Sequence, residues 1–143
     1  MNIDINYYLD DILSNAMIIE ENALRRSRFN DVSLKEMNAI LAIGNRSRAT
    51  VTEIAEHLLV TLGTVTTCVN NLERKGYVMR ERSTKDRRVV FLDLTDAGYL
   101  VYRLHKRFRH MMIQEITKTL SHSEVAAMKR GLANLHRFLE DCK

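Results

Sequence analysis

The polar side chains between Thr61 and Arg74 are the residues whose types and spacing best suit a chemical task. Apolar residues recur at positions 65, 68, 69 and 72, on one face of a helix. The opposite face carries small, hydroxyl and amide residues with one charge: Gly63, Thr64, Thr66, Thr67, Asn70, Asn71 and Arg74. Hydroxyls and amides suit the base edges and thymine methyls of a DNA major groove, and Gly63 permits close backbone approach. A solvated helix face, which normally carries Glu and Lys pairs, is the alternative.

A basic segment follows this helix. Glu73–Arg88 holds seven basic and three acidic residues, a surplus equal to the net charge of +4 of the whole chain. Strand-like runs at 78–82 and 89–94 flank the tip Ser83–Arg88, which predicts a hairpin. We expect Arg88, oriented by Asp86, to enter a DNA minor groove, whereas an Arg–Asp pair that only stabilises the hairpin is the alternative. The predicted DNA contacts are Thr61, Gly63, Thr64, Thr66, Thr67, Asn70, Asn71, Arg74, Arg82, Ser83, Lys85, Asp86, Arg87 and Arg88.

Helices with clear start signals must position these groups. A hydroxyl residue followed three positions later by Glu predicts a capping box at Ser33–Glu36, Thr50–Glu53 and Ser121–Glu124. Single caps are expected at Thr61 and Thr95, and Gly76 is expected to end the polar helix in a left-handed conformation. Apolar spacing predicts a first helix over 5–26, and helices after each cap.

The segment Thr50–Leu94 resembles the winged helix-turn-helix of the MarR family of bacterial transcription regulators. Asp86-Arg87-Arg88, a strand, and then Leu94-Thr95-Asp96-Ala97-Gly98 match that family's wing and its LTxxG helix start, and the flanking helices also fit. The resemblance implies a mainly α (α+β) single domain over 1–143. Its DNA-binding lobe would span 33–95, with dimerisation helices at 1–32 and 96–143. A homodimer would place two recognition helices roughly 34–36 Å apart on a pseudo-palindromic site.

Several other classes of protein are not indicated. The sequence has no glycine-rich phosphate loop, nucleophile elbow or zinc-protease motif, so we expect no enzyme, no metal and no cofactor. It has no secretory signal and no apolar run of membrane-spanning length, and its two cysteines suit a reducing cytoplasm. A regulator that responds to a phenolic ligand or to oxidation at Cys68 stays an alternative, although a small buried thiol is the plainer interpretation. A purely structural DNA-binding protein is the alternative from another class.

The stretch Arg103–Met112 mixes basic and apolar side chains, which suits either a solvated helix or a site for an amphiphile on an acidic carrier. The runs SRFNDVSLKEMNAI, VTLGTVTTCVNNLERKGYV and RLHKRFRHMM resemble MarR-family repressors of fatty-acid biosynthesis in Gram-positive bacteria. That resemblance implies long-chain acyl carrier protein as co-repressor. The candidate chain-lining residues are Ile12, Ala16, Ile19, Met37, Ile40, Leu41, Leu104, Phe108 and Met111. The candidate carrier contacts are Arg25, Arg26, Arg28, Arg103, His105, Arg107 and Arg109. The alternative is that the apolar residues only fill a dimer core.

Overall fold

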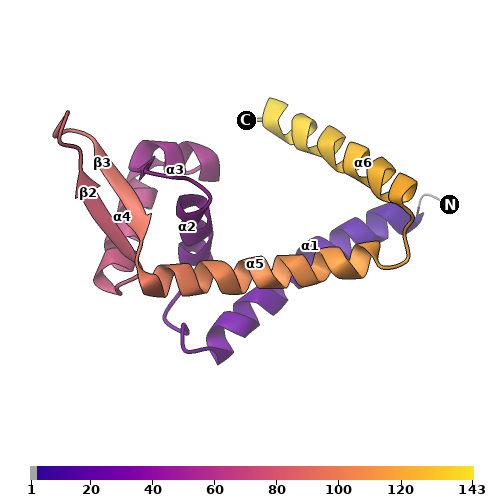
Figure 1. Ribbon diagram of the computed structural model, residues 1–143. Helices are drawn as coiled ribbons and strands as arrows, with labels where there is room; N and C mark the ends of the chain where they lie inside the picture. The colour runs from indigo at the N-terminus through magenta and orange to yellow at the C-terminus, as the bar shows by residue number, and fades with distance from the viewer. Residues whose placement is uncertain (1–2) are drawn as a thin grey trace. The chain divides into compact units, whose positions relative to one another are not determined.

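The computed structural model describes the backbone of residues 3–143 and the side chains of residues 5–143. It is mainly helical, with a small antiparallel sheet (Figure 1). The elements in chain order are α1 (Ile3–Arg26), α2 (Leu34–Gly44), β1 (Ala49–Thr50), α3 (Val51–Leu58), α4 (Leu62–Arg74), β2 (Val78–Arg82), β3 (Val90–Leu94), α5 (Asp96–Thr117) and α6 (His122–Asp141). The chain divides into two compact units, Met1–Arg103 and Leu104–Lys143, and α5 passes from the first into the second. That the whole chain is one domain stays a prediction.

The start and stop signals of the helices are confirmed. All three capping boxes form, with each hydroxyl accepting from the Glu amide and each Glu carboxylate accepting from the cap amide. Thr61 caps α4 by accepting from the Thr64 amide at 3.2 Å. Gly76 has a φ of +85°, a left-handed conformation that favours glycine, directly after the last turn of α4. These local contacts fix where α2, α3, α4 and α6 begin.

The elements from α2 to β3 form a winged-helix lobe around one apolar core. Its sheet has the order β1-β3-β2, in which Ala49 pairs with Leu92, and Val78 pairs with Leu94. Residues from each of these elements are buried together, including Ile40, Ile54 and Leu72 at 0% exposure. The hairpin β2–β3 extends beyond this core beside α4 (Figure 1). The predicted winged helix-turn-helix is therefore confirmed, and its recognition helix is α4.

The sheet differs from the sequence prediction in two details. β1 was not predicted, because two residues carry no periodic pattern and become a strand only by pairing with distant β3. The third strand begins at Val90 rather than Val89, whose amide instead bonds the Asp86 carbonyl at 3.0 Å within the hairpin tip.

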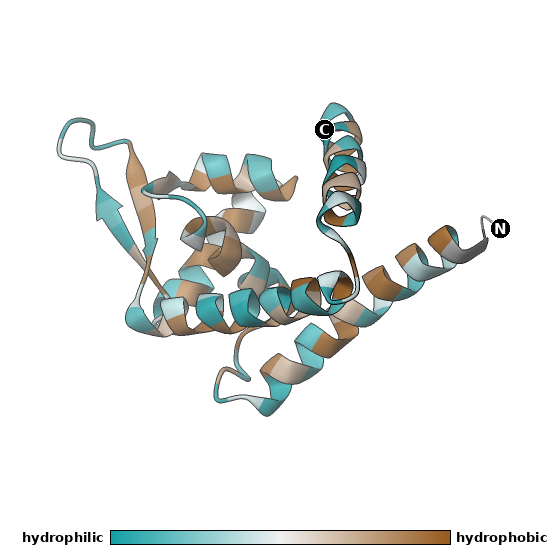
Figure 2. Ribbon diagram, turned by 45° about the vertical axis from the view of Figure 1, so that its right-hand side comes forward, coloured by the Kyte–Doolittle hydropathy of each residue, from teal (hydrophilic) through white to brown (hydrophobic). Residues whose placement is uncertain are grey.

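The outer helices carry more apolar surface than this chain covers by itself. α1 exposes Ile5, Tyr8, Leu9, Ile12 and Ile19, each by at least 43%. Within the second unit, α6 exposes Leu132, Leu135, Phe138 and Leu139 by at least 40%. Figure 2 shows hydrophobic residues recurring between hydrophilic ones along both helices. None of the described helices has the length and hydropathy to cross a membrane.

Candidate nucleic-acid interface

The recognition helix α4 separates its apolar and polar residues as the sequence predicts. Val65, Val69 and Leu72 are buried, and Cys68 is half-buried, so this face holds α4 against the core. The predicted DNA contacts of α4 are exposed, except Asn71, which is half-buried. Because its turns are anchored at both ends by Thr61 and Gly76, α4 presents these side chains from a fixed backbone.

Internal hydrogen bonds determine what several of these side chains can offer to a ligand. The Thr66 hydroxyl donates to the Leu62 carbonyl at 2.8 Å, so this exposed side chain offers DNA its methyl group rather than its hydroxyl proton. The Thr61 and Thr64 hydroxyls lie 2.8 Å apart. The Asn71 carbonyl oxygen accepts from Arg74 at 3.2 Å. The Asn70 carbonyl oxygen accepts from an arginine of the neighbouring strand, Arg80, at 2.5 Å. A threonine methyl group suits contact with a thymine methyl group.

A groove of about 790 Å³ runs along one side of α4. Predicted contact residues of α4, among them Gly63, Thr64 and Thr67, line it together with Ser33, Lys35 and Asn38 of α2. The α2 residues were missing from the predicted interface. Their sequence signal, a capping box, locates the start of α2 but not its closeness to α4. The exposed Lys35 adds a positive charge at the edge of the same groove.

The wing tip is shaped by side chain to backbone hydrogen bonds. The Ser83 hydroxyl accepts from the amides of Lys85 and Asp86, at 3.2 and 3.3 Å. The Asp86 carboxylate accepts from the Arg88 amide at 3.0 Å, whereas the Arg88 Nε lies 3.9 Å from it. Asp86 therefore fixes the Arg88 backbone more closely than its guanidinium. The Arg88 side chain is 95% exposed and extends from an ordered turn.

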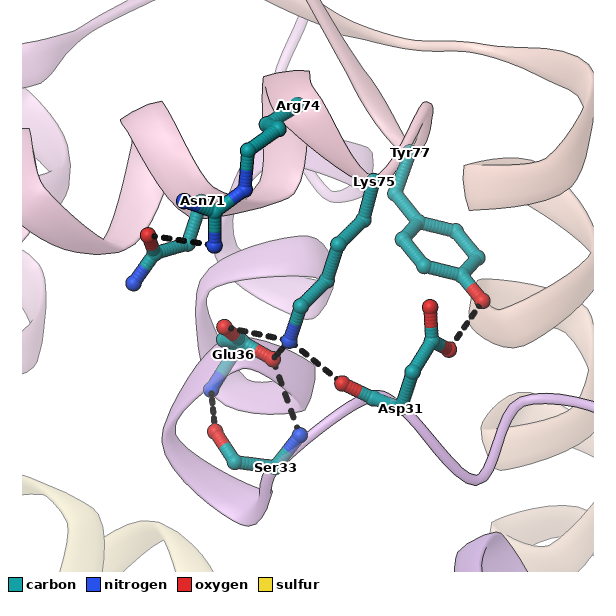
Figure 3. A network of polar contacts seen from close by, with 7 residues as sticks. All are labelled: Asp31, Ser33, Glu36, Asn71, Arg74, Lys75 and Tyr77. Atoms are coloured by element: carbon teal, nitrogen blue, oxygen red, sulfur yellow. Dashed lines mark hydrogen bonds and ion pairs between the residues drawn. The ribbon is translucent and has the colours of Figure 1, made fainter.

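A polar network joins the end of α4 to the start of α2 (Figure 3). Lys75 Nζ donates to both carboxylate oxygens of Glu36, at 2.9 and 3.0 Å, and to the Asp31 carbonyl. The Tyr77 hydroxyl donates to the Asp31 carboxylate at 2.6 Å. Burial, followed by the hydrogen bond to Asp31, raises the pKa of Tyr77 to about 12, so its proton stays in place at neutral pH. Glu36 is 6% exposed and also completes the capping box of α2 with Ser33.

Replacing Lys75 by methionine is expected to lower the free energy of unfolding by about 2 kcal/mol, because the buried Glu36 carboxylate would lose its cation. Lys118→Met is the matched control, since the Lys118–Glu115 side chains are 62% and 71% exposed. That exposed pair should contribute less than about 0.5 kcal/mol. Urea denaturation of the two variants measures the difference. Equal midpoints would contradict a structural role for the Lys75–Glu36 pair.

The predicted effector residues fall in both units. In the first unit, Met37 and Ile40 are buried in the core of the winged-helix lobe, Leu41 and Ala16 are half-buried, and Ile12 and Ile19 are each 51% exposed. In the second unit, Leu104 and Met111 are 42% and 55% exposed, and Phe108 is half-buried. That these residues line an acyl-chain site stays a prediction.

The predicted carrier contacts are mostly exposed arginines. Arg25, in the last turn of α1, forms an ion pair with Glu21 at 2.8 Å, so it has an acidic neighbour one helical turn earlier. Arg26, Arg28, Arg103, Arg107 and Arg109 are exposed. His105 accepts a hydrogen bond from Arg109 at 3.2 Å. Partial burial, then Arg109 and Lys106, lower the pKa of His105 to about 4. His105 is therefore neutral at pH 7 and adds no positive charge to this surface.

Cys68 and Cys142 are free thiols in different surroundings. Burial, followed by the nearby Glu36 carboxylate, raises the pKa of Cys68, so little reactive thiolate forms at neutral pH. We expect iodoacetamide to modify the exposed Cys142 at least about tenfold faster than Cys68 in the folded protein, and both alike in urea. Mass spectrometry of the two peptides over time measures this. Equal rates in the folded protein would favour oxidation at Cys68 as a regulatory step.

Comparison with known proteins agrees with this geometry. The MarR family model matches residues 32–90. The HTH-type transcriptional regulator YfiV of Bacillus subtilis (strain 168) is 31% identical over 113 residues, which span 79% of this chain and 71% of the relative. The protein in the crystal structure of Streptococcus pneumoniae FabT in complex with DNA is 53% identical in sequence to this chain, and the two structures have a TM-score of 0.89 over 98% of both chains. SlyA, at 17% identity and a TM-score of 0.76, shares the fold. The chain belongs to the MarR family of transcriptional regulators.

Proposed function

We propose that this protein is a transcriptional repressor that binds a pseudo-palindromic operator through α4 and the wing. The observation that carries the proposal is the 53% identity over 98% of the chain to a protein crystallised with DNA. The local geometry supports it, because α4 has an outward face of hydroxyls and amides and the wing has exposed arginines. Major-groove edges suit the first set, and phosphates or a minor groove suit the second.

A homodimer accounts for the exposed apolar side chains of the outer helices. The stripe Met128, Leu132, Leu135 and Leu139 repeats at alternating steps of four and three, which suits packing against another helix. The exposed apolar residues of α1 are a second such surface. A second copy of the chain would cover both surfaces and would supply the second recognition helix for the other half of the operator.

The proposed effector is a long-chain acyl group on acyl carrier protein, acting as co-repressor of fatty-acid-biosynthesis genes. The resemblance of three sequence runs to the repressors of these genes suggests it. The middle of α5 adds support, since exposed Arg103, Arg107 and Arg109 lie on the same helix as exposed Leu104 and Met111. Basic side chains suit an acidic carrier, and flexible apolar side chains suit an acyl chain.

Two measurements test the proposal in turn. Selection from a duplex library with a random centre of about 20 base pairs should enrich one pseudo-palindromic sequence, the operator of the dimer. Failure of the library to converge would contradict specific DNA binding.

Calorimetry with acyl carrier protein then tests the effector. Longer acyl chains should bind more tightly, by up to about 0.8 kcal/mol for each methylene buried. Binding of the carrier and binding of the operator are linked. If acylated carrier raises the affinity for the operator by some factor, the operator should raise the affinity for the carrier by the same factor. Carrier without an acyl group is the control. Affinities that do not depend on chain length or on operator would contradict the co-repressor and leave DNA binding intact.

A further inference from the structure

Arg80 links the wing to the recognition helix. Its Nη2 donates to the carbonyl oxygen of Asn70 at 2.5 Å, and its Nη1 lies 3.6 Å from a Glu73 carboxylate oxygen. Both acceptors belong to α4, one turn apart, whereas Arg80 belongs to β2. One guanidinium therefore holds two exposed side chains of the recognition helix, and nothing in the sequence pattern identified Arg80 as part of the site.

The strand register explains why Arg80 reaches α4. Arg80 pairs with Leu92 of β3, and directly paired residues of antiparallel strands share a face of the sheet. Leu92 is 1% exposed, and Val78, two residues before Arg80 and on the same face, is 2% exposed. The Arg80 stem therefore leaves the sheet on its buried side, where α4 packs against β2, and the side chain as a whole stays 30% exposed. From this position the Arg80 guanidinium contacts the exposed side chain of Asn70 on α4.

This contact limits the hydrogen bonds that Asn70 can offer to DNA. An asparagine amide has an accepting oxygen and a donating NH₂ group, and an arginine has only donors. Arg80 takes one of the two lone pairs of that oxygen and places a positive charge beside it, whereas the Asn70 NH₂ group keeps both of its donors for a base. Adenine is read by asparagine through both ends, the oxygen accepting from N6 and the NH₂ group donating to N7. Guanine presents two acceptors side by side, N7 and O6, and needs donors alone.

We propose that Arg80 is a positioning residue that holds Asn70 as a hydrogen-bond donor, so that Asn70 selects a G·C base pair over A·T. The inference rests on the proposed DNA-binding function and names the specificity of one residue within it. Arg80 acts through Asn70 and does not itself read the base. Removal of the guanidinium frees the Asn70 oxygen to accept, which permits the two-bond contact with adenine.

The test compares base preferences of four proteins in the same duplex selection: wild type, Asn70→Ala, Arg80→Met and the double variant. Methionine keeps an unbranched stem over the sheet and removes all donors. The base pair at which Asn70→Ala loses its base preference is the one that Asn70 contacts. At that base pair the wild-type protein should prefer G·C. Arg80→Met should move that preference toward A·T by about fivefold or more, the size of one base contact. In the Asn70→Ala background, Arg80→Met should have no further effect at that pair.

Arg46→Met is the matched control, because Arg46 follows α2, is not among the predicted DNA contacts and donates to the Ala42 carbonyl at 2.9 Å instead of to α4. It removes the same charge and should leave the preference at the Asn70 pair unchanged. The wild-type comparison with Asn70→Ala needs no change at Arg80, so a wild-type preference for A·T would overturn the inference even if Arg80→Met unfolds.

Three results would overturn the inference: a wild-type preference for A·T at the Asn70 pair, an unchanged base profile in a folded Arg80→Met, or an Arg80 effect that persists without Asn70. A wild-type library that never converges would instead contradict the proposed function.

Discussion

Gly98→Ala is expected to lower the free energy of unfolding by about 3 kcal/mol, the upper end for inserting a methyl group into a packed site. A Cβ on Gly98 would lie 2.1 Å from the Tyr77 carbonyl oxygen and 3.2 Å from Leu94 Cβ. The Tyr77 carbonyl is a backbone group, so it cannot rotate away from the new methyl group as a flexible side chain could. It is also held in place because it accepts a hydrogen bond from the Thr95 amide at 3.1 Å. The start of α5 would have to separate from the segment that joins α4 to β2.

Gly131→Ala is the matched control for this substitution. Gly131 lies in α6, and a Cβ there has no atom within 4 Å. Alanine has a higher helix propensity than glycine, so this variant should be neutral or more stable by up to about 1 kcal/mol. Thermal and urea denaturation of both variants measure the contrast. If Gly98→Ala were as stable as Gly131→Ala, close packing could not be the reason for glycine in the LTxxG pattern.

The parts of the fold that depend on local contacts were predictable from the sequence. The capping boxes, the Thr61 cap and the left-handed Gly76 each need residues only a few positions apart, and each forms as predicted. The inward face of α4 follows from helical periodicity alone. β1 depends on a partner strand some forty residues away in the chain, so its two residues carry no local signal. Gly98 was predicted from the family pattern, but its close contact with Tyr77 emerges only from the packing.

In the candidate interface, too, the local features were predictable and the contacts between elements were not. Helical spacing identified the outward face of α4, and charge identified the wing. The links between elements were not predictable, because Arg80–Asn70 and Lys75–Glu36 join residues through the tertiary fold. Lys35 is part of the groove for the same reason. A surface read from one helix at a time therefore omits the residues that other elements bring to it.

Arg88→Ala is expected to weaken binding to the selected operator by at least about tenfold, since a lost DNA contact costs about 1–3 kcal/mol and a dimer would lose two. The Arg88 side chain is 95% exposed and starts from a turn held by Asp86, so it can enter a narrow minor groove without refolding the wing. The melting temperature should barely change, because an exposed ion pair at 3.9 Å contributes little stability. Fluorescence anisotropy with labelled operator measures the affinity.

Two further variants separate the position of Arg88 from its charge. Arg88→Lys keeps the charge but replaces the planar guanidinium with a strongly hydrated ammonium, so it should bind less tightly to an operator with an A·T-rich minor groove and equally well to random duplex. Arg130→Ala removes one positive charge from the face of α6 opposite Met128 and Leu132, and it should leave operator affinity unchanged. If Arg88→Ala and Arg130→Ala bound the operator alike, Arg88 would have no role in the groove. Its bond to Asp86 would then serve only the hairpin.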